Sequence, residues 1–309
     1  MTTLPLHFSS EVAAARAADK PIVALESTII THGMPYPQNE EVARQVEQDL
    51  RDAGATPATI AVIEGRLHIG LDAEQLSTLA QAKGVAKLSR ADMAVCIAQG
   101  GTGATTVAAT MIAAHLAGIA VFATGGIGGV HKGASDSFDI SADLMELAQT
   151  PVSVVAAGAK AILDVAKTLE VLETQGVPVI AYGQDSFPAF WSASSVHTAP
   201  LRMDDVAQIA QAHLMRGAMG LPGGQLIANP IPVEAEIRAQ DLDPIISRAQ
   251  SDADQHGITG KAVTPYLLQR IFELTEGRSL TANIALVRNN ARLAAQIAVA
   301  LEKMHTSKQ

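Results

Sequence analysis

Short runs of apolar residues alternate along the chain with longer segments in which apolar residues recur every three or four positions. The runs predict buried strands, and the periodic segments predict amphipathic helices. The predicted strands are Ile22–Leu25, Ile119–Ala123, Val152–Ala156 and Val179–Tyr182. Because helices separate them, we expect an α/β fold whose mixed, largely parallel sheet is covered by helices on both faces (α/β/α).

Several helix boundaries can be predicted from capping residues. We expect Asn39 to cap a helix on which Val42, Val46 and Leu50 share one face, and Asp72 to cap the following helix. Further helices are predicted at Thr105–Leu116, Ile162–Gln175 and Asp204–Met215. Upstream of Asp72, a glycine turn joins two apolar runs and predicts a hairpin of Thr59–Ile63 and Leu67–Ile69.

The C-terminal third of the chain is expected to be helical. Three amphipathic segments follow Asp241, and the last of them is Thr281–Lys303. No internal repeat, low-complexity tract or linker rich in Pro, Gly and Ser divides the sequence. We therefore expect one domain over residues 1–309.

Charge and composition narrow the possible partners. The 309 residues include 22 Lys and Arg against 31 Asp and Glu, a net charge of −9, with six Phe, three Tyr and one Trp. So few cations and aromatic residues argue against a nucleic-acid or anionic-membrane surface. The single cysteine, Cys96, excludes an intramolecular disulfide. Since neither a secretory signal nor a membrane span is recognisable, we expect a cytoplasmic protein.

Glu26 is a candidate for acid–base chemistry because it directly follows the run Ile22–Leu25. Parallel sheets bind ligands at the carboxyl ends of their strands. A carboxylate next to an apolar strand is partly desolvated, which suits a general acid or base. The alternative is an ordinary polar residue at the point where a strand reaches the surface.

Lys160 is a candidate for covalent chemistry. It follows the small apolar stretch Val152–Ala159 and precedes the apolar residues Ala161–Leu163, so its amine is expected to be partly desolvated. Desolvation and the positive N-terminal end of the next predicted helix both disfavour the ammonium form and so lower the pKa. A neutral amine is what Schiff-base formation with a carbonyl requires. The alternative is a lysine whose stem packs while its charged end reaches the solvent.

The stretch Thr124–Gly133 contains five glycines in ten residues and ends in two cations, His131 and Lys132. Glycine lets the backbone approach a ligand and present N–H groups to an anion, so we expect an anion-binding or close-approach loop. It matches neither a P-loop nor a dinucleotide fingerprint, and a flexible turn is the alternative. Lys87 could be a second cation for a phosphate or a solvated surface residue.

Three carboxylates and two serines lie within residues 136–143. If Asp139 and Asp143 occupy one helical turn, their side chains point the same way. Oxygen ligands favour Mg²⁺ or Mn²⁺, while capping of a helix is the alternative explanation. Farther along, Asn283 places an amide in an apolar helix face, where either a nucleobase edge or a hydrogen bond between helices would satisfy it.

Seven stretches resemble those of a known enzyme family and occur in the family's order over nearly the whole chain. They are Ala24–Asn39, Gly103–Thr110, Phe122–Gly133, Phe138–Leu144, Ala157–Val165, Thr259–Leu268 and Leu280–Ala298. The chain thereby resembles the pseudouridine-5′-phosphate glycosidases. The resemblance implies an α/β/α fold, a homotrimer and one Mn²⁺ per subunit. It also implies reversible cleavage of pseudouridine 5′-phosphate to uracil and ribose 5-phosphate.

The resemblance also implies roles for individual residues. By position, Lys160 matches the family's covalent lysine, Glu26 its proton donor and Asp139 its metal ligand. Asn283 falls where the family contacts uracil, and His131 is expected to contact the phosphate. The other substrate-binding positions are Lys87, Val107, Ser141, Ala142 and Asp143.

Two other function classes remain open at this point. One is a metal-dependent N-nucleoside hydrolase, which needs more carboxylate ligands and no lysine. The other is a non-catalytic protein that binds a sugar phosphate, which needs neither a desolvated lysine nor an acid beside it. Release of uracil from pseudouridine 5′-phosphate rather than uridine 5′-phosphate would distinguish all three.

Overall fold

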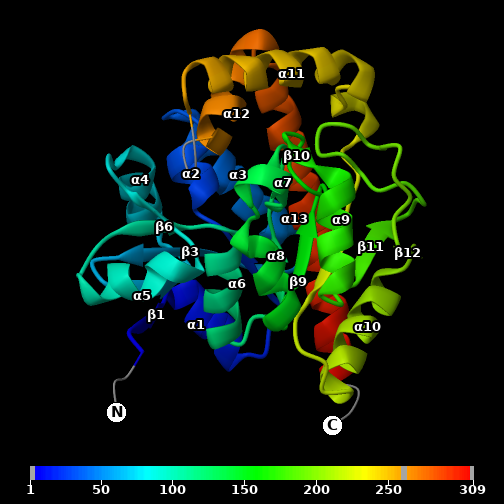
Figure 1. Ribbon diagram of the computed structural model, residues 1–309. Coiled ribbons are helices and arrows are strands. Elements are labelled where there is room, and N and C mark those ends of the chain that lie inside the picture. Colours follow the sequence, from blue (N-terminus) through cyan, green and yellow to red (C-terminus); the bar gives the residue numbers. More distant parts are fainter. Residues whose placement is uncertain (1–3, 259–262, 307–309) are drawn as a thin grey trace.

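The computed structural model describes residues 4–258 and 263–306 (Figure 1). The strands are β1 (Leu6–Phe8), β2 (Ile22–Leu25), β3 (Thr56–Ile63), β4 (Arg66–Ile69), β5 (Ala86–Leu88), β6 (Gly103–Thr105), β7 (Val121–Ala123), β8 (Val130–His131), β9 (Ser153–Ala156), β10 (Leu163–Asp164), β11 (Val179–Tyr182), β12 (Leu201–Met203) and β13 (Gln225–Ala228). The helices are α1 (Ser10–Ala17), α2 (Thr28–His32), α3 (Gln38–Asp52), α4 (Ala73–Gln81), α5 (Arg90–Ala98), α6 (Val107–Leu116), α7 (Ala134–Ser137), α8 (Ala142–Gln149), α9 (Val165–Thr174), α10 (Val206–Ala218), the 3₁₀ helix η1 (Val233–Ala235), α11 (Ala239–Gln255), α12 (Val263–Leu274) and α13 (Arg278–Thr306). The mixed, mostly parallel sheet and the helical C-terminal part confirm the predicted fold class.

The order of the strands places a topological switch point in the middle of the main sheet. Within the described residues, the order is β1-β4-β3-β2-β7-β9-β13-β11-β12, with β6 beside β3 and β5 beside β6. The strands from β3 to β12 along this path are parallel, whereas β4 and β6 run antiparallel to β3. From β2 the chain moves to β3 on one side and returns to the other side at β7. Open α/β sheets bind ligands at the carboxyl ends of strands at such a point.

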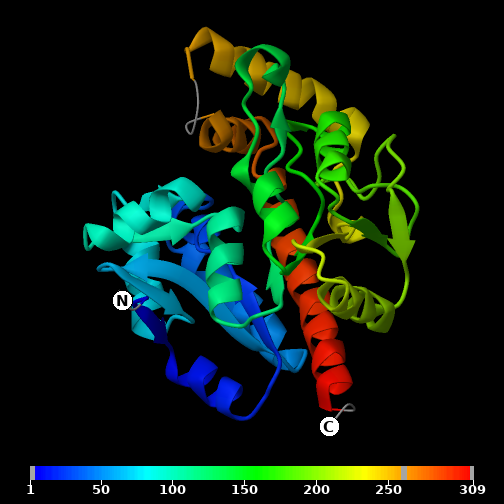
Figure 2. The ribbon, with the colours of Figure 1, turned by 60° about the horizontal axis from the view of Figure 1, so that its bottom comes forward.

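Helix α13 supports the sheet along its length. It contacts β2, β7 and β9, and α3 and α10 pack beside it. Figure 1 shows α6, α8 and α9 on the opposite face, and α11 and α12 at the end of the molecule away from both termini. In Figure 2, α13 (red) runs between the N-terminal elements and the later strands. Buried side chains from Val12 to Leu301 form one hydrophobic cluster around these layers.

Several predicted elements are confirmed. The runs Ile22–Leu25 and Val179–Tyr182 coincide with β2 and β11. The predicted hairpin is formed by β3 and β4, which pair antiparallel. Asp72 caps α4 through a capping box, in which its side chain accepts from the backbone N–H groups of Glu74 and Gln75. Every helix in the described ranges is too short or too polar to cross a lipid bilayer.

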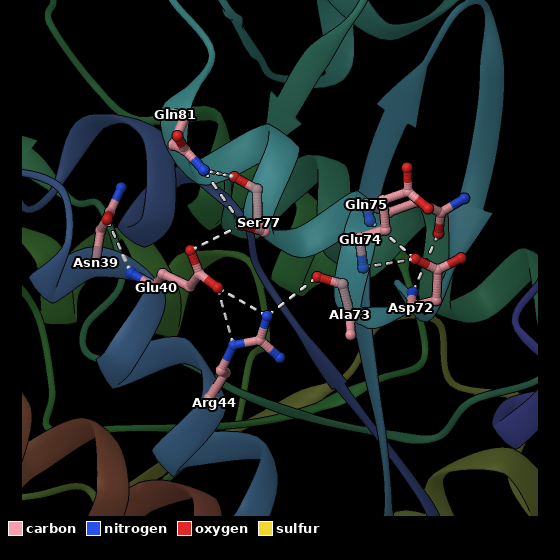
Figure 3. Close-up of polar contacts among 9 residues, drawn as sticks. All are labelled: Asn39, Glu40, Arg44, Asp72, Ala73, Glu74, Gln75, Ser77 and Gln81. Carbon is pink, nitrogen blue, oxygen red and sulfur yellow. Dashed lines mark hydrogen bonds and ion pairs between the residues drawn. The ribbon is translucent and has the colours of Figure 1, made fainter.

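The prediction that Asn39 caps α3 is wrong. Pro37 occupies the N-cap position, and Asn39 is inside the helix and buried. Its Nδ2 donates to the carbonyl oxygens of Ile30 (2.7 Å) and Ala80 (2.8 Å), so this amide ties α2 and α4 to α3. In Figure 3 the guanidinium of Arg44 adds a second link, since it bonds both Glu40 and the carbonyl oxygen of Ala73 on α4.

Other boundaries differ because tertiary pairing overrides local periodicity. The helix predicted to start at Ile162 starts at Val165, since Leu163 and Asp164 pair with β8 and Asp164 serves as the N-cap. Strands β1, β5, β6, β8, β10, β12 and β13 were not predicted. Of the motif Thr259–Leu268, residues 259–262 lie outside the described part of the chain.

Candidate active site

A cavity of about 490 Å³ opens at the carboxyl ends of β2 and β7, facing α12 and α13. Its volume is typical of a site for a small molecule. All ten residues that the sequence analysis selected line it: Glu26, Lys87, Val107, His131, Asp139, Ser141, Ala142, Asp143, Lys160 and Asn283. The fold therefore brings together side chains that lie up to 257 positions apart in the sequence, from Glu26 to Asn283.

Glu26 lies at the end of β2 and is only 9% exposed. The hydroxyls of Thr28 and Thr124 donate to its two carboxylate oxygens. Thr124 follows β7, the strand next to β2, so the switch point itself supplies one of these donors. Two hydroxyl groups on separate elements fix the orientation of the carboxylate toward the cavity.

Lys160 lies four residues past Ala156, the last residue of β9, and is half-buried. Its backbone N–H donates to the carbonyl oxygen of Ile127 (3.1 Å), and Ile127 donates to the carbonyl oxygen of Gly158 (3.1 Å). The segments that leave β7 and β9 thus run side by side into the cavity wall. The next helix starts only at Val165, so Lys160 does not stand at a helix N-terminus as expected.

The glycine loop after β7 is used for close packing within the protein. A Cβ at Gly126 would collide with the ring of Phe190, and one at Gly128 with the side chains of Ser141 and Asp143. Since its N–H donates to Asp143 Oδ2 (2.8 Å), Gly128 does not present this group to an anion. At Gly126 and Gly128 the glycines thus allow close packing within the protein, which neither the expected approach to a ligand nor a flexible turn describes.

Asp143 is a buried carboxylate that accepts two backbone hydrogen bonds. Its Oδ1 accepts from Ala108 N (2.9 Å) in the first turn of α6, and its Oδ2 accepts from Gly128 N. A negative charge at a helix N-terminus is favourable. Asp143 thus fixes α6 against the glycine loop, at the point where both reach the cavity.

Asp139 and Asp143 do not share a helical turn, so that prediction is wrong. Helix α7 ends before Phe138, which has a left-handed backbone (φ 55°), and α8 begins only at Ala142. The side chain of Asp139 is 41% exposed, with Oδ2 4.0 Å from His131 Nδ1. The two carboxylates therefore have separate surroundings, one at the edge of the cavity and one buried.

Positive charge gathers on the side of the cavity formed by β5 and β8. Burial is the main cause that lowers the pKa of His131; Asp139 opposes this effect, and the charges of Lys160 and Lys87 lower the pKa further. Burial and the charge of Lys87 likewise lower the pKa of His32. Val107 begins α6, where the backbone N–H has no partner within the helix. These groups could bind an anion.

Asn283 of α13 lines the cavity together with the apolar side chains of Phe190, Leu268 and Leu286. Its Oδ1 accepts a hydrogen bond from Trp191 Nε1 (2.6 Å). The expected alternative of a hydrogen bond within the protein is thus present, although its donor is in a loop and not in a helix.

Comparison with known proteins agrees with this arrangement. The sequence model of the family described as Indigoidine synthase A like protein matches residues 11–300. A pseudouridine-5′-phosphate glycosidase from Roseobacter denitrificans is 79% identical over 301 residues, 97% of each chain. One from Jannaschia sp. is 71% identical over 299 residues, covering 97% of this chain and 99% of the relative.

The chain belongs to the pseudouridine-5′-phosphate glycosidase family. Two solved structures share its fold. The prealnumycin C-glycosynthase, crystallised with ribulose 5-phosphate, has a TM-score of 0.91 at 38% identity and covers 99% of this chain and 100% of its own. An indigoidine synthase A-like protein from Thermotoga maritima has a TM-score of 0.89 at 32% identity, with 98% of each chain covered.

Sequence reasoning missed part of the cavity wall of this glycosidase-family chain. His32, Phe190, Thr264 and Leu268 were not selected as site residues, although all four line the cavity. The signal for Phe190 was available, because it stands beside Trp191, the only tryptophan in the chain. Thr264 and Leu268 gave no comparable signal, since α12 reaches the cavity only through its packing on α11 and α13.

The donor set for a metal is small. Among residues 4–258 and 263–306, no group of three His, Cys, Asp or Glu side chains is close enough to hold one ion. Asp139 offers an exposed carboxylate at the cavity, which fits Mn²⁺ or Mg²⁺ that keeps most of its water ligands. A hydrolase that binds its metal through several carboxylates gains no support from these residues.

Proposed function

We propose that the protein catalyses the reversible cleavage of pseudouridine 5′-phosphate to uracil and ribose 5-phosphate through a covalent adduct on Lys160. The observation that carries this proposal is the convergence of one amine and one buried carboxylate, Lys160 and Glu26, on a single cavity. The names of the relatives, and the pentose phosphate bound to the related C-glycosynthase, support the same substrate class.

The bond to be broken joins two carbons, so the two-carboxylate mechanism of ordinary glycosidases is unsuitable for it. In the proposed first step, Lys160 Nζ bonds to C1′ while the bond between C1′ and the ring oxygen breaks. Glu26 supplies the proton that this oxygen takes up. The Glu26 carboxylate takes a proton from the alkylated nitrogen, whose lone pair then forms a C=N bond as the bond to uracil breaks. Glu26 passes this proton to uracil C5, and the hydrolysis that follows returns a proton to Glu26. Water hydrolyses the imine and releases ribose 5-phosphate and the free amine.

The phosphate is proposed to lie where positive charge gathers in the cavity. Lys87 supplies a cation, the N-terminus of α6 at Val107 supplies a backbone N–H, and His131 and Ser141 add polar contacts. Asn283 is proposed to contact the base on the other side. Glu26 and Lys160 line the same cavity and would then face C1′.

We also propose that Asp139 holds one Mn²⁺ through a single carboxylate oxygen. When bound, the ion would orient and polarise groups of the substrate through its water ligands. The homotrimer implied by the family resemblance remains a proposal. Size-exclusion chromatography with light scattering tests it directly.

The central test is release of uracil from pseudouridine 5′-phosphate, with uridine 5′-phosphate as the matched N-glycoside. We expect turnover of the first only. Lys160→Ala should lower kcat by several orders of magnitude, whereas Lys167→Ala, an exposed lysine paired with Asp164, should leave it unchanged. Borohydride should trap ribose 5-phosphate on the peptide that contains Lys160. A label on another lysine, or undiminished turnover by Lys160→Ala, would rule out the proposed adduct.

A further inference from the structure

The loop between β11 and β12 brings a buried indole to the only amide of the cavity wall among the described residues. Trp191 is 1% exposed, and its Nε1 donates to Asn283 Oδ1 at 2.6 Å. An indole nitrogen can only donate, and an amide can accept only through its oxygen. This contact therefore determines which end of the Asn283 amide faces Trp191 and which end is left for a ligand.

The indole is held firmly in place. The carbonyl oxygen of Trp191 accepts from Ile237 N (2.9 Å), and the preceding residue, Phe190, donates to the carbonyl oxygen of Ala157 (2.9 Å). The rings of Phe190 and Trp191 pack against each other with centroids 5.1 Å apart. Because backbone bonds on both sides and a ring contact fix the indole, it cannot turn away to release Asn283 Oδ1 without disrupting the loop.

With Oδ1 turned toward Trp191, Nδ2 is the end of the Asn283 amide that is left for a ligand. Asn283 is half-buried, lines the cavity and makes no hydrogen bond through Nδ2 with any residue that the structure describes. Phe190 and Leu286 provide apolar surfaces beside it, as a planar heterocycle requires. The polar contact available on this side of the cavity is therefore an N–H donor.

We propose that Trp191 is a positioning residue that turns the N–H groups of Asn283 toward the base. This inference rests on the proposed function and deepens it. An N–H donor can form a hydrogen bond with a carbonyl oxygen of uracil. In a base that carries an amino group at the same position, two donors would face each other and no hydrogen bond would form. The site thereby selects a base that carries a carbonyl oxygen there and rejects the base with an amino group.

The test is inhibition of pseudouridine 5′-phosphate cleavage by three free bases: uracil, cytosine (4-amino) and isocytosine (2-amino). For the wild-type protein, at least one amino base should bind about 10- to 100-fold more weakly than uracil. Trp191→Phe removes the N–H while keeping an aromatic ring, so the amide can rotate and offer its oxygen. The inhibition constant of that amino base should then lie within about threefold of the inhibition constant of uracil.

Two further variants separate positioning from general packing. Asn283→Asp replaces the donor by an acceptor, so the amino base should bind more tightly than uracil. Leu268→Ala is the control: Leu268 lines the cavity and is not among the contacts that hold the indole, so the variant should weaken all three bases alike without changing their ratios. If Trp191→Phe does not fold, the reversed preference of Asn283→Asp carries the test.

The possible outcomes distinguish this inference from the proposed function. If the wild-type protein releases no uracil, the proposed function fails. If it does release uracil, but the three bases inhibit it equally or Trp191→Phe retains the wild-type ratios, Trp191 does not set base specificity. Unchanged preference in Asn283→Asp would overturn the inference in the same way.

Discussion

Replacement of Asn290 by aspartate should destabilise the protein in a way that depends strongly on pH. Asn290 of α13 is fully buried; its Nδ2 donates to Thr124 O (2.8 Å) and Gly125 O (3.3 Å), and its Oδ1 accepts from Asn229 Nδ2 (3.0 Å). An aspartate of the same shape keeps the acceptor for Asn229. It places a second oxygen against the carbonyl oxygen of Thr124, where only a donor fits.

The new carboxyl group can restore the missing bond only by taking up a proton, so folding raises its pKa above its ordinary value. From a reference pKa of about 3.9, protonation costs about 5 kcal/mol at pH 7.5 and about 2 kcal/mol at pH 5.5. The loss of stability at pH 7.5 cannot exceed about 5 kcal/mol, because the carboxylate would stay ionised if its hydration by water cost less free energy than protonation. Since the folded state binds the extra proton, lowering the pH favours it, and the loss of stability disappears below the ordinary pKa.

Urea unfolding of the wild type and of Asn290→Asp between about pH 5.5 and pH 8 measures this loss. Asn289→Asp is a matched control on the same helix: its Nδ2 donates to Pro230 O (3.0 Å), but the residue is only half-buried, so water can replace the bond. We expect a smaller loss and a weaker pH dependence for it. Equal losses in the two variants, or a loss in Asn290→Asp that does not shrink toward low pH, would refute the reasoning.

Two other perturbations test the charges around the cavity and the core. Arg90→Met leaves the fully buried carboxylate of Glu146 without the guanidinium that bonds it at 2.7 and 3.1 Å. The free energy of unfolding should fall by about 2–4 kcal/mol, and Arg90→Lys should recover part of this loss. An unchanged free energy of unfolding in Arg90→Met would mean that Thr150 and water are sufficient partners for Glu146. Lys87→Met removes a positive charge that disfavours the imidazolium form of His32, so an NMR titration should show a higher pKa for His32. Lys160→Met is the control and should leave this pKa unchanged. A constant or lower pKa of His32 in Lys87→Met would contradict the effect ascribed to the charge of Lys87.

The sequence was sufficient to predict the elements whose signal is local. Ile22–Leu25 and Val179–Tyr182 are continuous apolar runs because parallel strands in the middle of a sheet are buried on both faces. Asp72 caps α4 because its side chain reaches only the first turn of its own helix. Asn39 has the same capping chemistry, but its amide is used by the carbonyl oxygens of Ile30 and Ala80, which no local pattern reveals.

The same distinction applies to the candidate site. Glu26 and Lys160 could be selected because each directly follows an apolar run, and parallel strands bring their carboxyl ends to one edge. The separation of Asp139 from Asp143 depends on the left-handed backbone of Phe138, a conformation that phenylalanine rarely adopts. The contact of Trp191 with Asn283 joins residues 92 positions apart, so only the packing of the loop on α13 creates it.

Helix α13 couples the two halves of the cavity. Asn283 and Asn290 are seven residues apart, so they lie on one face of the helix about 10 Å from each other along its axis. Asn290 holds the backbone of Thr124, whose hydroxyl donates to Glu26, while Asn283 presents its N–H groups to the cavity. A rigid helix cannot move one amide without the other. The positions of the Glu26 carboxylate and of the Asn283 amide are therefore set together, and in the proposed function this would hold the acid and the base contact at a constant separation.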